Sequence, residues 1–238
     1  MSEWKAAIIV GTGASALGLG HAEDIAVPTR FGDAKLAHAD LDGSPVLLLA
    51  RHGAGHRVPP HRINYRANAE ALRVLGCERC FATAAVGSLR DDWPAQTIAV
   101  PHDLLDLSGR NLTVHEDEVV HTDFTHPFDE DLRTRLLDAC PSEAKREAVY
   151  VNANGPRFES PAEVRMMRLL GGDVVGMTAG TEAIVMRETG IRYALICAVT
   201  NLASGVGTAP VDHSQVYQQM KQSMGVIAAT LRAAISTL

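Results

Sequence analysis

The 238-residue chain is poor in cysteine and in aromatic residues, and it has no long apolar run. Four cysteines are too few for a disulfide framework at this length, so we expect a reducing, cytoplasmic location. No stretch approaches the roughly 18 apolar residues of a membrane span, and the first residues lack the basic start and apolar core of a signal peptide. We therefore expect no membrane partner.

The charge balance and the histidine and cysteine spacings exclude further classes of protein. The formal net charge is −6, which disfavours a nucleic-acid partner because such partners attract basic surfaces. Cys77 and Cys80 have the spacing of half a zinc site, but no second cysteine pair follows them. The histidines form no His-Glu-x-x-His pattern. We predict neither a metal site nor a bound cofactor.

Short apolar runs alternate with helical patterns along the chain. The runs that read as buried strands are residues 6–10, 45–50, 80–86, 97–100, 148–151, 173–178 and 192–200. Helical patterns occupy residues 64–76, 128–139, 161–170 and 181–188, and Ser214 is suited to cap a long final helix. This alternation predicts an α/β fold, and no linker divides residues 1–238 into two domains.

The segment from Gly155 to Glu163 joins a predicted strand to a helix and leaves an aromatic ring and a carboxylate at the junction. Ser160 suits the N-cap, Pro161 the first helical position, and Glu163 stands three residues past the cap, which together predict a capping box. A loop that feeds a helix N-terminus is a ready site for a polar ligand. Glu159 is therefore either a ligand-binding group or a solvated acid that the helix dipole favours.

Polar or small residues follow several predicted strands at the point where each strand ends. The turn at Gly11 and Gly13 is either an anion site or a plain tight turn. An arginine fork suits phosphate oxygens, although Arg51 pairing with a surface acid is the alternative. Ligands of open α/β sheets gather outside the carboxyl ends of strands, so we predict one pocket. The residues that converge there are Thr12, Arg51, Ala85, Glu159, Thr178 and Asn201.

Six motifs, taken in order, resemble those of the purine nucleoside phosphorylase and methylthioadenosine phosphorylase family. They are Gly11-Thr12-Gly13, Arg51-His52-Gly53, Asn64-Tyr65-Arg66-Ala67-Asn68, Thr83-Ala84-Ala85-Val86-Gly87-Ser88-Leu89-Arg90, Gly155-Pro156-Arg157-Phe158 and Met177-Thr178. The resemblance covers residues 6–220. It implies a single α/β domain whose mixed, twisted sheet forms a distorted barrel flanked by helices, assembled as a homotrimer or hexamer.

The resemblance also implies the reaction and the roles of individual residues. Inorganic phosphate, the co-substrate, displaces a purine from a nucleoside with inversion and yields a sugar 1-phosphate. The implied phosphate ligands are Thr12, Arg51, His52, Thr178 and the backbone amide of Ala85. Met177 and Phe158 pack against sugar and base, and His121 reaches into a neighbouring subunit's pocket. Ala84 departs from the methylthioadenosine branch, which has a threonine there, so one hydroxyl is missing.

Two residues bear on the choice of purine. Methylthioadenosine phosphorylases place an aspartate where this chain has Asn201, and an asparagine donates hydrogen bonds but supplies no proton. The six-oxopurine branch pairs such an asparagine with a glutamate directly after the Phe of the Gly-Pro motif, where Glu159 stands. A carboxylate accepts from the ring N–H of hypoxanthine or guanine and repels the lone pair of adenine. We predict a 6-oxopurine nucleoside as substrate, with Asn201 and Glu159 as catalytic residues.

Two opposing signals bear on the sugar. Residues 51–68 look like the methylthio branch, and a short chain with this block and an asparagine at the base site resembles bacterial S-methyl-5′-thioinosine phosphorylases. His213, however, lies near the position where ordinary purine nucleoside phosphorylases keep a histidine for the 5′-hydroxyl. We predict methylthioinosine, with inosine or guanosine and methylthioadenosine as alternatives. A nucleoside hydrolase of the same superfold and a non-catalytic binding protein are further alternatives. Arg51 and Thr178 speak against a hydrolase, which has no use for a phosphate clamp.

Overall fold

A computed structural model describes residues 3–11, 22–208 and 211–238, except for the side chain of His213. Thr12 and the His213 side chain therefore lie outside the described part of the site. The strands are β1 (Ala6–Val10), β2 (Ala22–Val27), β3 (Ala34–Leu41), β4 (Ser44–Ala50), β5 (Arg79–Ser88), β6 (Ile98–Ala99), β7 (Asp103–Asp106), β8 (Val149–Asn152), β9 (Val174–Gly176) and β10 (Arg192–Leu202). The helices are η2 (Pro60–Arg62), α1 (Tyr65–Val74), α2 (Glu130–Ala139), α3 (Pro161–Leu169), α4 (Ala179–Glu188) and α5 (His213–Ser236).

Each strand and helix that the sequence predicts is present, but three strands escaped prediction. β2 is a largely exposed edge strand, so it lacks an apolar run, and β3 has buried residues interrupted by exposed ones. β7 has only two half-buried leucines between exposed aspartates. The predicted cap of α5 was also wrong. Asp212, not Ser214, is the N-cap, and its carboxylate accepts a hydrogen bond from the Ser214 amide.

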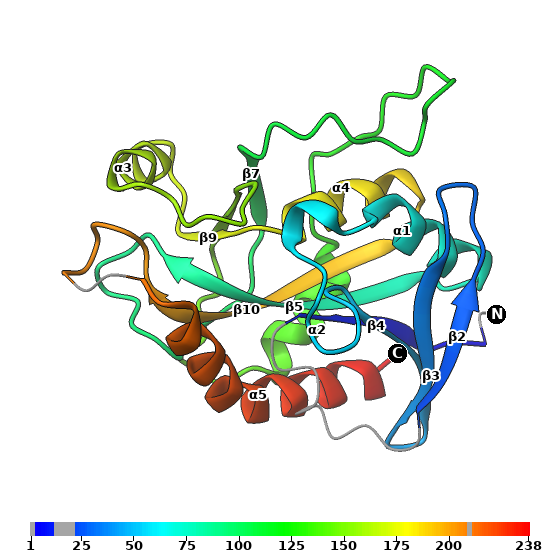
Figure 1. Ribbon diagram of the computed structural model, residues 1–238. Coiled ribbons are helices and arrows are strands. Elements are labelled where there is room, and N and C mark those ends of the chain that lie inside the picture. Colours follow the sequence, from blue (N-terminus) through cyan, green and yellow to red (C-terminus); the bar gives the residue numbers. More distant parts are fainter. Residues whose placement is uncertain (1–2, 12–21, 209–210) are drawn as a thin grey trace.

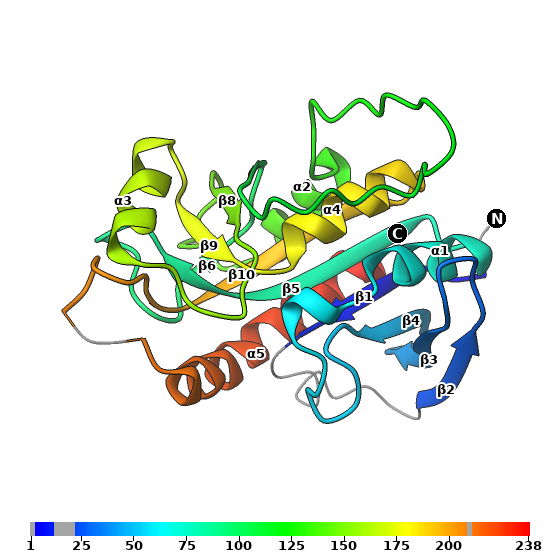
Figure 2. The same cartoon turned by 45° about the horizontal axis from the view of Figure 1, so that its top comes forward.

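The sheet divides into two wings along one edge of β5. β1 pairs with residues 80–82 of β5 and leads through β4 and β3 to β2. β9 pairs with Gly87 and Ser88 at the other end of β5 and leads through β8 to β7. β10 runs parallel to β5 along its opposite edge, and the two strands cross the middle of the molecule in Figure 2. Residues 83–86 therefore lie between the two wings, where the sheet can admit a ligand.

Helices cover both faces of the sheet. α2 and α5 lie against one face, and α1 and α4 lie against the other (Figure 1). Alternate residues of β5 pack into the two cores, so Ala84 and Val86 belong to the α1 and α4 side while Phe81 belongs to the α2 and α5 side. These facts confirm the expected α/β architecture with a mixed sheet flanked by helices. Among the described helices, none is both long and apolar enough to cross a bilayer.

Candidate active site

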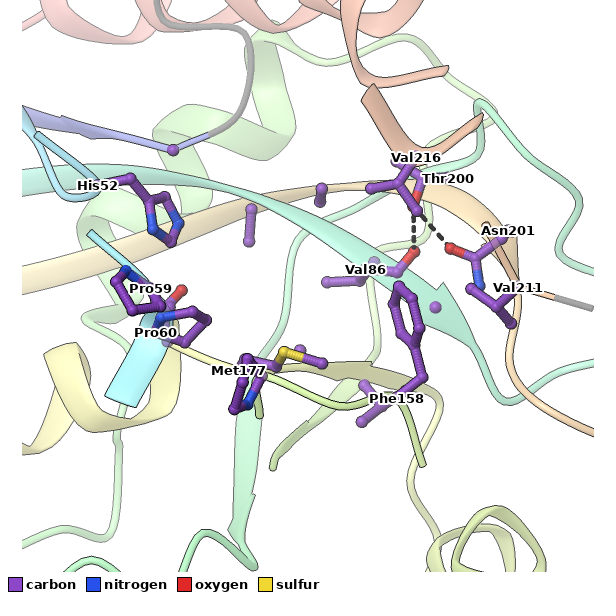
Figure 3. A pocket seen from close by; sticks show the side chains of 18 of the residues that line it. His52, Pro59, Pro60, Val86, Phe158, Met177, Thr200, Asn201, Val211 and Val216 are labelled. Carbon is purple, nitrogen blue, oxygen red and sulfur yellow. Dashed lines mark hydrogen bonds between the residues drawn. The ribbon is translucent and has the colours of Figure 1, made fainter. Parts of the chain in front are cut away.

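The gap between the two wings opens into a cavity of about 530 Å³. This volume is in the range of small-molecule sites. Its walls come from the residues that follow β1, β4 and β8, from the ends of β9 and β10, from the middle of β5 and from the start of α5. The structure brings eight predicted site residues together here: Arg51, His52, Ala85, Phe158, Glu159, Met177, Thr178 and Asn201. In Figure 3, His52 and Asn201 lie at opposite ends, with Met177 and Phe158 between them.

His121 is the one described site residue that lies elsewhere. It lines a separate hollow with Val120, Phe124 and Glu188, on the long excursion between β7 and α2. His121 therefore does not reach the cavity of its own chain. The sequence reasoning missed other lining residues, among them Val211 and Val216 near the start of α5. The only sequence signal at Val216 is the apolar stripe of α5, and such a stripe is equally typical of a helix face packed in the core.

Arg51 lies buried at one end of the cavity. Its Nε and Nη2 atoms donate to the two carboxylate oxygens of Glu182 at 2.6 and 2.8 Å, and Nη1 donates to the carbonyl oxygen of Thr83 at 2.6 Å. Burial alone would lower the pKa of the guanidinium, but the charge and hydrogen bonds of Glu182 raise it overall. A guanidinium has five N–H donors, so two remain, one on Nη1 and one on Nη2. Pairing with a surface acid is thus wrong, because the partner is a buried carboxylate.

Three further groups sit at this cationic end. His52 Nδ1 lies 2.7 Å from the carbonyl oxygen of Val58, which can only accept, so Nδ1 carries a proton. Thr178 holds the N-cap position of α4, but its side chain makes no capping bond. The carbonyl of Thr83 faces Arg51, and alternate strand residues share an edge, so the amide of Ala85 faces the same gap. Arg51, the Thr178 hydroxyl, the Ala85 amide and a helix N-terminus form an environment suited to an anion, beside the His52 ring.

Asn201 lies at the opposite end, on an irregularity in β10. Val199 pairs with Val86 and Asn201 with Gly87, so Thr200 is an extra residue that re-aims the strand. The Asn201 amide nitrogen donates to the carbonyl of Leu202 at 2.9 Å. Its oxygen accepts from the Thr200 hydroxyl at 2.9 Å, as Figure 3 shows. A carbonyl cannot donate, so this pairing fixes which amide atom is nitrogen and leaves one N–H of Asn201 for a ligand.

Two glutamates at the start of α3 have different environments, Glu159 just before the N-cap Ser160 and Glu163 in the first turn. Glu163 completes the predicted capping box with Ser160 and pairs with Arg157 at 2.7 Å. The hydrogen bonds from Arg157 and from the Ser160 amide lower the pKa of Glu163 to about 2. Glu159 is half-buried in the cavity wall, and burial raises its pKa. The solvated helix-start acid is therefore Glu163, and Glu159 is a cavity carboxylate.

Gly11 is packed against the guanidinium of Arg51. A Cβ at residue 11 would lie 2.6 Å from Arg51 Nη1, which the bonds to Glu182 and Thr83 hold in place. We expect Gly11→Ala to destabilise the fold by about 1–3 kcal/mol and to raise the KM for phosphate. Denaturant unfolding and phosphate titration measure both effects.

Gly225→Ala is the matched control. Gly225 is exposed within α5, and a Cβ added to it would meet no atom of another described segment within 4 Å. Alanine there should raise the stability by about 0.5–1 kcal/mol and leave the KM for phosphate unchanged. An unchanged phosphate KM in Gly11→Ala would contradict the argument.

The described part of the chain contains no cluster of side chains suited to bind a metal ion. Residues 3–11, 22–208 and 211–238 contain no group of three or more His, Cys, Asp or Glu side chains placed to hold an ion. Cys77, Cys80 and Cys197 are buried free thiols. Burial raises the pKa of the Cys77 thiol to about 11, so it carries no thiolate near neutral pH.

Residues 5–236 match the Phosphorylase superfamily, and the chain belongs to this family. A probable 6-oxopurine nucleoside phosphorylase from Moorella thermoacetica is 40% identical over 227 residues, which cover 92% of this chain and 87% of the relative. A probable S-methyl-5′-thioinosine phosphorylase from Pseudomonas syringae pv. tomato is 39% identical over 240 residues, with 97% and 98% covered. The solved methylthioadenosine phosphorylase of Schistosoma mansoni with adenine matches with TM-score 0.89 and 28% identity, covering 99% of this chain and 92% of that one. The family inferred from the motifs is confirmed.

Proposed function

We propose that this enzyme catalyses the phosphorolysis of a 6-oxopurine nucleoside, with S-methyl-5′-thioinosine as the preferred substrate. The observation that carries the proposal is that the two ends of the cavity differ in chemistry. Figure 3 shows His52 and Asn201 at opposite ends; Arg51 adjoins His52 at Gly11, and the half-buried Glu159 also lines the cavity. An anion and a hydrogen-bonding heterocycle thus have complementary places in one pocket. The products would be hypoxanthine and S-methyl-5-thioribose 1-phosphate.

The base would be recognised by two complementary groups. The free N–H of Asn201 can donate to a ring nitrogen or to the 6-oxo oxygen of a purine. Glu159, as a carboxylate, can accept the ring N–H of hypoxanthine or guanine, whereas adenine presents a lone pair to it. The names of the curated relatives from Moorella and Pseudomonas, a 6-oxopurine and a methylthioinosine phosphorylase, support this choice.

The reaction would proceed by direct attack of phosphate on the sugar. As the glycosidic bond breaks, electron density passes to the purine and positive charge develops on the sugar carbon. Arg51, His52, Thr178 and the Ala85 amide would hold the phosphate oxygens on the opposite side, and Asn201 would stabilise the departing base by donating to it. Phosphate is a co-substrate in this scheme, and the enzyme needs no covalent nucleophile and no cofactor.

The wall near the start of α5 favours an apolar 5′-substituent. Val211 and Val216 both line the cavity, and Met177 contributes a thioether. A methylthio group would lose little on leaving water for such a wall, whereas a 5′-hydroxyl would need a hydrogen-bond partner. We therefore place methylthioinosine before inosine and guanosine.

A side-by-side assay tests the proposal. The purified protein is incubated with and without phosphate on methylthioinosine, inosine, guanosine, methylthioadenosine and adenosine, and release of the free base is measured. We expect turnover only with phosphate, led by methylthioinosine. Leading turnover of methylthioadenosine would refute the base assignment, and base release without phosphate would indicate a hydrolase.

We also propose that the chain assembles as a homotrimer or hexamer in which His121 completes a neighbour's cavity. The segment that carries His121, residues 107–129, is attached to the end of α4. There Glu188 accepts hydrogen bonds from the Thr113 hydroxyl at 2.9 Å and from the Val114 amide at 2.8 Å. Two exposed valines lie on this segment beside the acidic Glu116, Asp117 and Glu118, with Val119 at 90% and Val120 at 45% exposure. Such a surface suits burial against another chain.

Two variants test the assembly, one through the oligomeric state and one through the kinetics. Val119→Asp should lower the mass measured by light scattering from three or six chains toward one, because a charge would enter an apolar contact. His121→Ala should keep the assembly and lower kcat/KM for the nucleoside about tenfold. A wild-type protein that is monomeric at micromolar concentration would refute the proposal.

A further inference from the structure

Arg110, which plays no part in the site described so far, makes hydrogen bonds with all of its donors. Nε donates to the Asn154 side-chain oxygen at 2.9 Å, and Nη2 donates to the backbone carbonyls of Asn154 at 2.8 Å and Met177 at 3.3 Å. Nη1 donates to the hydroxyls of Thr181 at 2.8 Å and Tyr65 at 3.1 Å. These five bonds use all five guanidinium N–H groups. Arg51, by contrast, keeps two for a ligand.

The acceptors of Arg110 belong to four structural elements or their ends, in three stretches that are distant in sequence. Asn154 follows β8, Met177 follows β9, Thr181 is in the first turns of α4, and Tyr65 begins α1. The network extends beyond the guanidinium as well. The buried Asn152 amide donates to Thr181 and to Asp106 of β7, at 3.1 and 2.9 Å. Arg110 is thus a polar junction at the point where four elements meet.

Two of these acceptors belong to segments that form the wall of the cavity. Met177 lines it directly, and Asn154 leads into the turn that carries Phe158 and Glu159. Gly155 has a φ of +62° and packs so closely on Met177 that a Cβ there would lie 2.5 Å from its sulfur. A shift of either segment would therefore displace the other. The Tyr65 hydroxyl also donates to the carbonyl of Pro60, another cavity residue, at 2.9 Å.

Arg110 is also unusual in its charge environment. Every acceptor named above is neutral, and no ion pair with a carboxylate is found for it among the described residues. Its contribution is therefore the planar arrangement of donors, which a lysine cannot reproduce with three donors on one atom. Arg110→Lys keeps the charge and loses the geometry.

We propose that Arg110 is a positioning residue that holds Met177 and the turn before Phe158 and Glu159 in the geometry that receives the nucleoside. It does this without touching nucleoside or phosphate. The expected effect on nucleoside kinetics rests on the proposed function. The effect of Arg110 on the positions of Met177 and of the turn after Asn154 does not depend on any substrate. Arg110 also begins the excursion that carries His121, so the same residue links that excursion to the cavity wall.

The kinetic consequence is selective. A misplacement of the wall by about 1 Å can cost roughly 10²-fold in rate. We expect Arg110→Met to lower kcat/KM for the nucleoside about 100-fold and Arg110→Lys about tenfold. The KM for phosphate should change less than kcat/KM for the nucleoside in both variants, because Arg51 and Glu182 form a separate network and Thr178 is the one proposed phosphate ligand in the segments that Arg110 holds. Arg168→Met is the matched control, since Arg168 pairs with Asp91 at the surface, and its kinetics should equal those of the wild type.

Hydrogen exchange of the free protein provides a second readout that needs no activity. We expect faster amide exchange in residues 153–159 and 177–181 of the Arg110 variants, with β1 as protected as in the wild type. If Arg110→Met does not fold, Arg110→Lys carries the test. Unchanged exchange in these two segments, or a loss that falls equally on phosphate and nucleoside, would overturn the proposal. If the wild type turns over no nucleoside, the proposed function fails and the exchange measurement alone decides the role of Arg110.

Discussion

Replacing Glu159 with alanine is expected to lower kcat/KM for hypoxanthine and guanine nucleosides by roughly 10³-fold, with little effect on the slow reaction of adenine nucleosides. The side chain lies in the cavity wall, half-buried, and burial raises its pKa. Its loss would leave the ring N–H of a 6-oxopurine without an acceptor, and a site of this kind discriminates strongly against an unpaired group. Steady-state kinetics on inosine and adenosine pairs, with and without the 5′-methylthio group, measure the effect.

Glu163→Gln is the control for this variant, because it removes a carboxylate four residues from Glu159, in the first turn of α3, that does not line the cavity. Glutamine keeps an oxygen for the Ser160 amide, so the helix cap survives, and only the pairing with the exposed Arg157 is weakened. We expect a stability loss below about 1 kcal/mol and an unchanged ratio of hypoxanthine to adenine activity. Equal effects of the two substitutions on that ratio would remove Glu159 from base recognition.

The pH dependence of Glu159 follows from the direction of its shift. Only the ionised carboxylate is a full acceptor for the base N–H, and burial raises the pKa of Glu159 above its ordinary value. The acceptor is therefore present above that raised pKa and is lost as the pH falls through it. In the pH profile of kcat/KM, Glu159→Gln should remove this acidic limb while the contribution of phosphate remains. An identical acidic limb in both proteins would assign it to another group.

The part of the cavity wall that carries Glu159 and Asn201 could be predicted from sequence because its determinants are local. The capping box, the turn at Gly155 and Glu159 lie within nine residues, and each part has its own chemical signature. Asn201 follows a long apolar run, so its place at a strand end was also readable. What the sequence did not show is the irregularity at Thr200 that turns Asn201 toward the cavity. Such irregularities depend on how a partner strand pairs and have no pattern of their own.

The partners of the arginines could not be predicted for a different reason. Arg51 and Glu182 are 131 positions apart, and Glu182 is an acid in the first turn of a helix, which reads as an ordinary dipole-favoured residue. Arg110 stands in a polar stretch between β7 and α2 that showed no periodicity at all. Only the folded chain shows that its five acceptors meet at one point. Polar networks of this kind are set by tertiary packing, whereas the strands and helices are set by local patterns.

The double variant that replaces both Arg51 and Glu182 is expected to be more stable than either single variant. Its kcat/KM for phosphate is expected to stay low. Both side chains are at most 3% exposed, and Tyr193 adds a hydrogen bond to Glu182 at 2.8 Å. Arg51→Met alone leaves a buried carboxylate without its cation, and Glu182→Gln alone leaves a buried guanidinium without its anion. Losing one partner of a buried pair costs about 3–5 kcal/mol, whereas replacing both by neutral groups is often nearly neutral.

The double variant separates the structural role of the pair from the chemical one. In Arg51→Met with Glu182→Gln, the glutamine oxygen can still accept the Tyr193 hydroxyl, so that hydroxyl keeps its acceptor. We expect its free energy of unfolding to lie within about 1–2 kcal/mol of the wild type, measured by denaturant unfolding. The kcat/KM for phosphate should remain lowered by roughly 10²–10³-fold, as expected for the loss of a preorganised donor to a developing charge. If phosphate use returned with stability, Arg51 would be a buried structural cation, and the anion would be held by His52, Thr178 and the backbone amides of β5.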